Sequence, residues 1–446
     1  MKYKHQFKWI LLLICALLYS ITGASTVMYI PIALQLCRVF WKTTFNEILD
    51  LLLFSIIVPD NYLIILTSVL AFILFINKLC AKKQVVFCAT VVVSYAIIVS
   101  LINNVPALNL IIYIVYIIPF FLLGHTLKKM TCGNKIDIEQ LYLSLKKILI
   151  VEGISILVYA ISHFSTVLTY KDMDWVTGTF GKYQCNVLMI YCCFNFIIFV
   201  DRYLRTKKTD IIPIALSAII LVSTSSVAYL IIFFMTFGLV LLLTSKMSAK
   251  SKMGIIILGC FSVFFLKTVT PQWIIDEFGK MLDVNYAFSR IGKIVFYRNT
   301  YFEIPKNEGV FKFLFGGGLG QYASRAAVTC AGNYVGLYDS YFEPYTSELF
   351  QKYILAYSRG LEGLADSPQA AFISLQGELG IIGVITTIVY FAKKMLRAKN
   401  VMAIECVLFF LGLMTVENVL EFAKICLAFW LAYYLCLRND IEGELS

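Results

Sequence analysis

The chain has 446 residues, of which 60% are hydrophobic and 15% are charged, and its formal net charge is +11. Soluble domains carry about 25% charged residues, so this composition excludes an ordinary soluble globular protein. The basic excess does not indicate nucleic-acid binding, because the lysines and arginines fall in short clusters between apolar blocks. That pattern is typical of the cytoplasmic loops of a multi-pass membrane protein.

The apolar blocks predict an all-α integral membrane bundle of about fourteen spanning helices, and of at least about eleven. Both termini are expected in the cytoplasm. The third span is short and could instead be re-entrant. The first 25 residues also resemble a signal peptide, but we favour an uncleaved first span. We expect spans over 8–24, 27–41, 47–59, 62–77, 85–103, 106–125, 148–164, 184–200, 210–223, 226–244, 254–269, 369–391, 400–416 and 419–437.

One long segment interrupts the regular succession of predicted spans and divides the chain into three parts. Residues 1–269 and 367–446 hold the predicted spans, and residues 270–366 contain none. Positive-inside parity places this loop outside the cytoplasm, and loops of such length are usually functional. Apolar residues recur at helical spacing over 273–281 and 349–357, so we expect helices on the membrane surface or capping the bundle. A small ectodomain without chemistry is the alternative.

The loop has a basic half, residues 280–325, followed by an acidic half, residues 339–366. Guanidinium groups bind diphosphate oxygens in pairs and offset the charge of a leaving diphosphate, while a carboxylate can accept a proton from a sugar hydroxyl. Solvation is the simpler interpretation for each of these charged residues except Arg290 and Arg325. The candidate charged residues are Arg290, Arg298, Arg325, Arg359 and Asp366.

A glycine-rich stretch, Phe315–Gly320, lies between the two favoured arginines. Its glycines allow either a tight turn or a nest of N–H groups that binds an anion, and no strand–helix context supports a dinucleotide site. The predicted anion contacts are Gly316, Gly317, Gly318 and Gly320.

Three further polar groups accompany predicted spans. Thr177–Lys182 precedes a span, and Lys182 is a candidate substrate contact. Asp366–Gln369 opens the span after the loop, with Gln369 as a second candidate contact. Glu152 and Glu378 lie in apolar surroundings, where ionisable groups are functional candidates. The face formed by Glu417, Glu421 and Lys424 is equally consistent with a structural ion pair.

The order of these motifs resembles that of the O-antigen polymerase and ligase superfamily of bacterial membrane glycosyltransferases. The resemblance rests on Gly178–Gly181 (GTFG), Ser289–Gly292 (SRIG), Phe315–Gly320 (FGGGLG) and Ser367–Gly383 (SPQAAFISLQGELGIIG). The ligase branch typically has a histidine followed by asparagine before the re-entering span. Here Gln369 and Ala370 occupy that place, which favours the polymerase branch.

The resemblance implies an enzyme of O-antigen or capsule synthesis in the cytoplasmic (inner) membrane, with its active site on the outer, periplasmic face. A glycan on undecaprenyl diphosphate would be transferred to a new lipid-linked repeat. Arg290 and Arg325 would bind the diphosphate, Arg298 and Arg359 are weaker candidates, and Asp366 or Glu378 would act as base or sugar orienter. Expected partners are the undecaprenyl-diphosphate-linked oligosaccharide, the bilayer and a chain-length regulator protein, with no metal, nucleotide or other cofactor. The alternatives are the ligase, a flippase or other transporter, and a non-enzymatic sensor.

Overall fold

The structure is a computed structural model of the whole chain. The residues that it describes are 2–59, 61–76, 83–131, 136–164, 176–181, 184–206, 210–224, 227–243, 253, 292–331, 345–358 and 370–443. All regular elements within these ranges are helices, which confirms the predicted all-α class.

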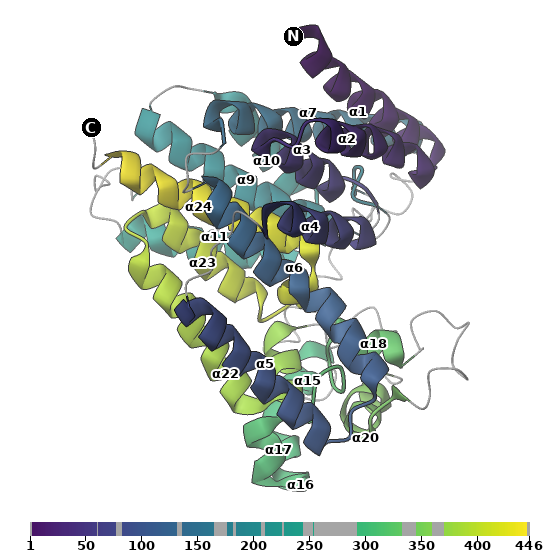
Figure 1. The fold of residues 1–446 in the computed structure, drawn as a ribbon, viewed down its shortest axis with the longest axis vertical. Coiled ribbons are helices and arrows are strands. Elements are labelled where there is room, and N and C mark those ends of the chain that lie inside the picture. Colours follow the sequence, from purple (N-terminus) through teal and green to yellow (C-terminus); the bar gives the residue numbers. More distant parts are fainter. Residues whose placement is uncertain are drawn as a thin grey trace.

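Most of the described residues belong to a bundle of apolar helices (Figure 1). The bundle comprises α1 (Lys2–Thr22), α2 (Tyr29–Trp41), α3 (Phe45–Ile56), α4 (Asn61–Ile76), α5 (Lys83–Ile102), α6 (Ala107–Thr131), α7 (Ile138–Ser162), α9 (Cys185–Thr206), α10 (Ile211–Ser223), α11 (Val227–Leu243), α22 (Ala371–Arg397), α23 (Val401–Leu413) and α24 (Ala423–Gly443).

Three of these helices, α6, α9 and α22, are long and apolar enough to cross a membrane, and several shorter apolar helices accompany them. These are features of a multi-pass membrane protein. Each predicted span within the described ranges coincides with a helix, although the helix ends differ by several residues. The predicted span 254–269 and the first amphipathic stretch, 273–281, lie outside the described residues.

The helix α24 lies at the centre of the bundle and packs against α6, α9 and α23. Its residues from Ile425 to Cys436 are buried on every side, as expected for a helix that is apolar all round. The indole of Trp430 donates to the carbonyl of Phe120 at 2.8 Å, next to Pro119 in α6. Stacking of Phe410 on Phe429, with ring centroids 4.2 Å apart, joins α23 to the same core.

The described residues of the predicted outer loop form a second, smaller helical unit beside one end of α22. Figure 1 shows this unit below the bundle, on the side opposite to both chain ends. Its core joins Phe296, Tyr322 and Phe350 to Ile373 near the start of α22. The unit comprises α15 (Gly292–Arg298), a π-helical turn (Asn299–Glu303), α16 (Ile304–Asn307), α17 (Gly309–Phe315), α18 (Arg325–Cys330), α20 (Glu348–Phe350), a second π-helical turn (Gln351–Leu355) and α21 (Ala356–Ser358).

This packing decides between the two positions predicted for the amphipathic stretch 349–357. Leu349, Phe350, Tyr353 and Ile354 are buried in the core of the small unit. The stretch therefore caps the bundle. Its helix begins where Ser347 accepts a hydrogen bond from the N–H of Phe350 at 3.0 Å, a side-chain cap that fixes the start of α20.

Candidate active site

The glycine stretch Phe315–Gly320 forms a buried turn between α17 and α18, and it folds around a carboxylate of the protein itself. Glu378 of α22 is 0% exposed. Its Oε2 accepts the N–H of Gly320 at 3.0 Å, and its Oε1 accepts the N–H groups of Tyr322 and Ser324, each at 3.1 Å. A run of backbone N–H groups that converges on a carboxylate is an anion nest, and the anion here is Glu378 of the protein itself.

The remaining N–H groups of the turn also donate within the protein. Those of Gly317 and Gly318 donate to the carbonyls of Gly377 and Glu378, at 2.8 and 3.0 Å. The N–H of Leu319 donates to the Ser100 hydroxyl at 3.2 Å, and that of Gly316 to Lys312. The turn is therefore a positioning device that joins α17, α22 and α5, with its N–H groups engaged internally.

The helix α22 is broken at Gly380, directly beside this turn. Gly380 has φ +66° and ψ −173°, so two helical segments meet there at an angle. A Cβ atom at Gly380 would lie 2.2 Å from the carbonyl oxygen of Leu314, and one at Gly316 would lie 2.4 Å from Glu378 backbone atoms. Glycine at both positions permits positive φ and the close approach of the two backbones.

Arg325 follows the turn as the first residue of α18, which Ser324 caps by accepting the N–H of Ala327 at 3.1 Å. The backbone N–H of Arg325 donates to Glu421 Oε2 at 2.7 Å. Its guanidinium lies 3.9 Å from the ring centroid of Phe422 and 5.3 Å from that of Tyr116. The side chain is half-buried, so an aromatic platform holds the cation while part of it remains accessible.

A second turn, Thr177–Phe180, is built in the same way around another buried glutamate. Glu152 of α7 accepts the N–H of Thr179 at 3.0 Å and a short hydrogen bond from the Thr179 hydroxyl. Gly178 has φ +54°, and a Cβ there would lie 2.2 Å from Glu152 Oε2. Both Glu152 and Glu378, the two ionisable candidates within spans, therefore hold glycine turns that lie far away in the sequence.

The start of α24 and the 3-10 turn before it contact both turns. Glu421, in the 3-10 turn Val419–Glu421, binds the N–H of Arg325 beside the first turn. Three residues later, the Lys424 ammonium donates to the carbonyls of Val58 at 2.6 Å and Phe180 at 3.2 Å. Glu417 accepts the Tyr229 hydroxyl at 2.8 Å. The three residues that share a predicted face thus tie different parts of the bundle together.

Arg298 is half-buried in the small unit, at the end of α15. The guanidinium donates to Asn299 Oδ1 at 3.1 Å and lies 5.7 Å from the ring centroid of Tyr357. A 2.9 Å hydrogen bond between Thr300 and the Tyr322 hydroxyl links this helix to the glycine turn. Burial raises the pKa of Tyr322, so its hydroxyl stays neutral and available for this bond.

Several predicted site residues lie outside the described residues, namely Lys182, Arg290, Arg359, Asp366 and Gln369. The structure brings together Gly316, Gly317, Gly318, Gly320, Glu378 and Arg325. Among the described residues, no group of His, Cys, Asp and Glu side chains could hold a metal ion.

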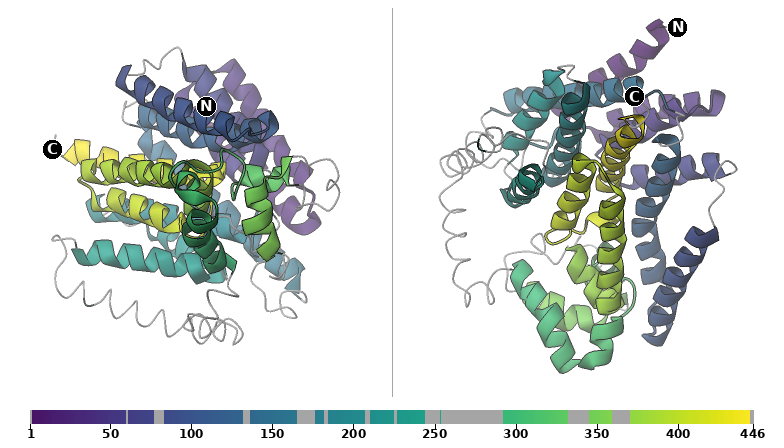
Figure 2. Two further views of the ribbon diagram at one scale, coloured as in Figure 1. Left: turned by 90° about the horizontal axis from the view of Figure 1, so that it is seen from below. Right: turned by 90° about the vertical axis from the view of Figure 1, so that its left-hand side faces the viewer.

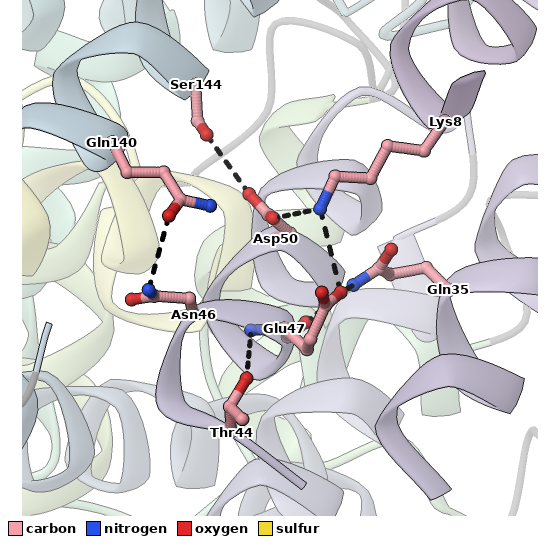
Figure 3. Close-up of polar contacts among 8 residues, drawn as sticks. All are labelled: Lys8, Gln35, Thr44, Asn46, Glu47, Asp50, Gln140 and Ser144. Atoms are coloured by element: carbon pink, nitrogen blue, oxygen red, sulfur yellow. Dashed lines mark hydrogen bonds and ion pairs between the residues drawn. The ribbon is translucent and has the colours of Figure 1, made fainter. Parts of the chain in front are cut away.

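A polar cluster at the N-terminal end of the bundle went unrecognised in the sequence (Figure 3). The buried ammonium of Lys8 in α1 makes a short ion pair with Asp50 of α3 and lies 3.6 Å from Glu47. Gln35 of α2 donates to Glu47 at 2.6 Å, and Ser144 of α7 donates to Asp50 at 3.1 Å. The cluster joins four helices. In the sequence, Lys8 belongs to one of the short basic clusters, and nothing in the spacing points to its partner 42 residues away.

Comparison with known protein families, with curated proteins and with solved structures finds no match for this chain.

Proposed function

We propose that the chain polymerises lipid-linked glycan repeats at the outer face of a bacterial cytoplasmic membrane, with both termini in the cytoplasm. The growing glycan leaves undecaprenyl diphosphate and joins the non-reducing sugar of a new lipid-linked repeat. The bond from the sugar to the diphosphate breaks, a glycosidic bond forms, and a base accepts the proton of the acceptor hydroxyl. One observation carries this proposal: the glycine turn, the start of α22 and Arg325 form a single unit.

That unit supports the proposal because the resemblance rests on the same motifs, which are separated in the sequence. Phe315–Gly320 and the Gln376–Gly380 part of the re-entry motif contact one another directly. Glu378 holds the turn through the N–H groups of Tyr322 and Ser324. This fixes the position of Arg325, which follows Ser324 directly. A preorganised cation is what a leaving diphosphate requires.

The roles in this proposal follow from the contacts of each residue. Arg325 binds the diphosphate, because its guanidinium is half-buried on aromatic rings and Glu421 holds its backbone N–H. Glu378 is a positioning residue, because both of its oxygens accept backbone N–H groups. The general base is therefore assigned to Asp366. The sequence also predicts that Arg290 binds the diphosphate, with Arg298 and Arg359 as weaker candidates.

The proposal is tested in a deletion strain that carries variants of the chain at equal expression. Arg325→Ala should abolish long-chain glycan and leave single repeats, and Arg290→Ala should do the same. Arg325→Lys keeps the charge but loses the bidentate fork, so it should retain only part of the polymer. Arg397→Ala is the control, because this exposed arginine lies at the other end of α22.

The glycan profile also separates the rival activities. Loss of a polymerase leaves one repeat on the final acceptor, loss of a ligase leaves none, and loss of a flippase prevents repeats from reaching the outer face. Normal glycan length in both arginine-to-alanine variants would refute the proposed polymerisation mechanism.

A further inference from the structure

The α16–α17 hairpin and the residue Phe302 shortly before it present a row of apolar side chains on the surface of the small unit. Phe302 is 66% exposed, Val310 66% and Phe311 55%, and Leu314 is also exposed. Gly309 joins the two helices at φ +86°, with no neighbouring atom within 4 Å of its Cβ position. Figures 1 and 2 show α16 and α17 at one extremity of the molecule, away from the bundle core.

This row continues the apolar surface of helices in the bundle. The helix α17 packs against α22, one of the three helices that can span a membrane. Beyond Gly380, α22 exposes Ile385 and Val389. The Lys312 ammonium of α17 makes a short hydrogen bond with Asn103, immediately after the end of α5, where Leu101 is exposed. An exposed apolar surface on a spanning helix faces lipid, so the hairpin extends a lipid-facing surface.

Aromatic groups just before the hairpin and a basic group within it match the boundary between lipid and water. Tyr297 and Tyr301 stack with ring centroids 6.0 Å apart, and their hydroxyls donate to the carbonyls of Thr415 and Phe372. Lys306 is exposed at the end of α16. Tyrosine and lysine side chains that flank an apolar surface are typical of membrane interfaces.

We propose that Phe302–Phe315 is inserted into the membrane interface and that its partner is glycerophospholipid. The exposed apolar side chains enter the acyl region, and Lys306 meets the phosphates. A segment of the predicted outer loop is then a membrane-embedded hairpin that stands beside the spanning helices. Because Gly316 directly follows α17, insertion also sets the depth of the glycine turn. If the proposed function holds, this depth brings Arg325 to the level of a lipid diphosphate.

Site-specific photocrosslinking tests the insertion without using glycan synthesis as a readout. Phe311→p-benzoylphenylalanine is placed in the full-length chain, which is reconstituted in dioleoylphosphatidylcholine vesicles and irradiated. Mass spectrometry should find phospholipid attached at residue 311. The same probe at Ile385 is the lipid-facing reference, and at Glu139, whose side chain is 77% exposed beside Arg202, it is the polar reference.

The yield of phospholipid adduct at residue 311 should match that at 385 and exceed that at 139 by at least about tenfold. A probe at Val310 on the same face should behave alike, so that the result does not depend on one variant. A yield at 310 and 311 no higher than at 139, with adduct present at 385, would overturn the proposal. Crosslinking at both positions to a second polypeptide instead of lipid would also overturn it. Neither outcome bears on Arg325, so failure here is distinct from failure of the proposed function.

Discussion

Replacing Glu378 by glutamine should loosen the glycine turn while preserving side-chain volume. The carboxylate accepts three backbone N–H groups, from Gly320, Tyr322 and Ser324. Glutamine keeps one acceptor oxygen and replaces the other with an NH₂ group. If that oxygen faces Tyr322 and Ser324, the NH₂ group faces the N–H of Gly320, and two donors oppose each other.

The cost can be worked from these contacts. One hydrogen bond to a charged acceptor is lost, which is worth about 1.5–3 kcal/mol, and a buried donor is left unsatisfied at about 1–3 kcal/mol. We take a local destabilisation of about 3 kcal/mol as the expected value. Since about 1.4 kcal/mol corresponds to a tenfold change in an equilibrium constant, opening of the turn should become roughly 150-fold more favourable.

Hydrogen–deuterium exchange measures this opening directly in detergent-solubilised protein. Peptides that cover 316–325 should exchange roughly 150-fold faster in Glu378→Gln than in the wild type when exchange follows the opening equilibrium. Glu405→Gln is the matched control. Glu405 is likewise 0% exposed, but it accepts a hydrogen bond from Thr236 at 2.8 Å and does not contact the turn. Unchanged protection of 316–325 in Glu378→Gln would refute the conclusion that the Glu378 carboxylate holds the glycine turn.

Three further predictions concern stability. Lys8→Met should cost about 3–5 kcal/mol, because it leaves Asp50 as a buried charge without its ion-pair partner. Gly380→Ala should cost at least about 1–3 kcal/mol, because its φ is positive and its Cβ would overlap Leu314. Both costs are measured as a lower apparent melting temperature. The Lys352 ammonium holds the pKa of Glu308 below its usual value through a 2.7 Å hydrogen bond. Below about pH 4.5, protonation of Glu308 should weaken the small unit by about 0.2–1 kcal/mol, seen as faster amide exchange around Lys352.

Each of these predictions has its own control. Adding Asp50→Leu to Lys8→Met should recover much of the lost stability, and no recovery would mean that the ion pair is not the cause. Gly238→Ala should be nearly neutral, because no atom lies within 4 Å of its Cβ position in α11, and an equal cost at Gly238 would contradict the overlap argument. For Glu308, the sign follows from its lowered pKa: its contribution is complete above the unfolded pKa and is lost as the pH falls. Glu308→Gln should abolish this loss, so an unchanged pH dependence in that variant would point to another group.

The helices could be predicted from the sequence because the bilayer fixes the length of an apolar block. The span predicted over 369–391 corresponds to α22, Ala371–Arg397. Helix ends were less predictable where charged residues find partners. The span predicted from residue 148 begins at Ile138 instead, since Lys146 pairs with Asp210 at 2.8 Å and Lys147 lies 5.1 Å from the Trp9 ring centroid. A segment with such charged residues has the low hydropathy of a loop, so hydropathy alone does not place it in a helix.

The roles of the candidate residues depend on contacts that hydropathy and spacing do not contain. An ionisable residue in an apolar block signals importance, and Glu152 and Glu378 were identified on that ground. Whether such a group acts on a substrate or holds the backbone depends on its tertiary partners. The partners of Glu378 lie between 54 and 58 residues away, and Thr179 lies 27 residues from Glu152. Because of this separation, the sequence does not reveal that Glu378 and Glu152 bind the two glycine turns.

The short stretch from Glu421 to Lys424 has a consequence for engineering this protein. Glu421 accepts the N–H of Arg325 next to the first turn, and Lys424 donates to the carbonyl of Phe180 in the second. The two turns belong to distant parts of the chain. A shift of this stretch by one residue would displace both turns in concert. Substitutions that retune one turn should therefore show non-additive effects with substitutions in the other, and swapping either turn between proteins requires transplanting the Glu421–Lys424 stretch with it.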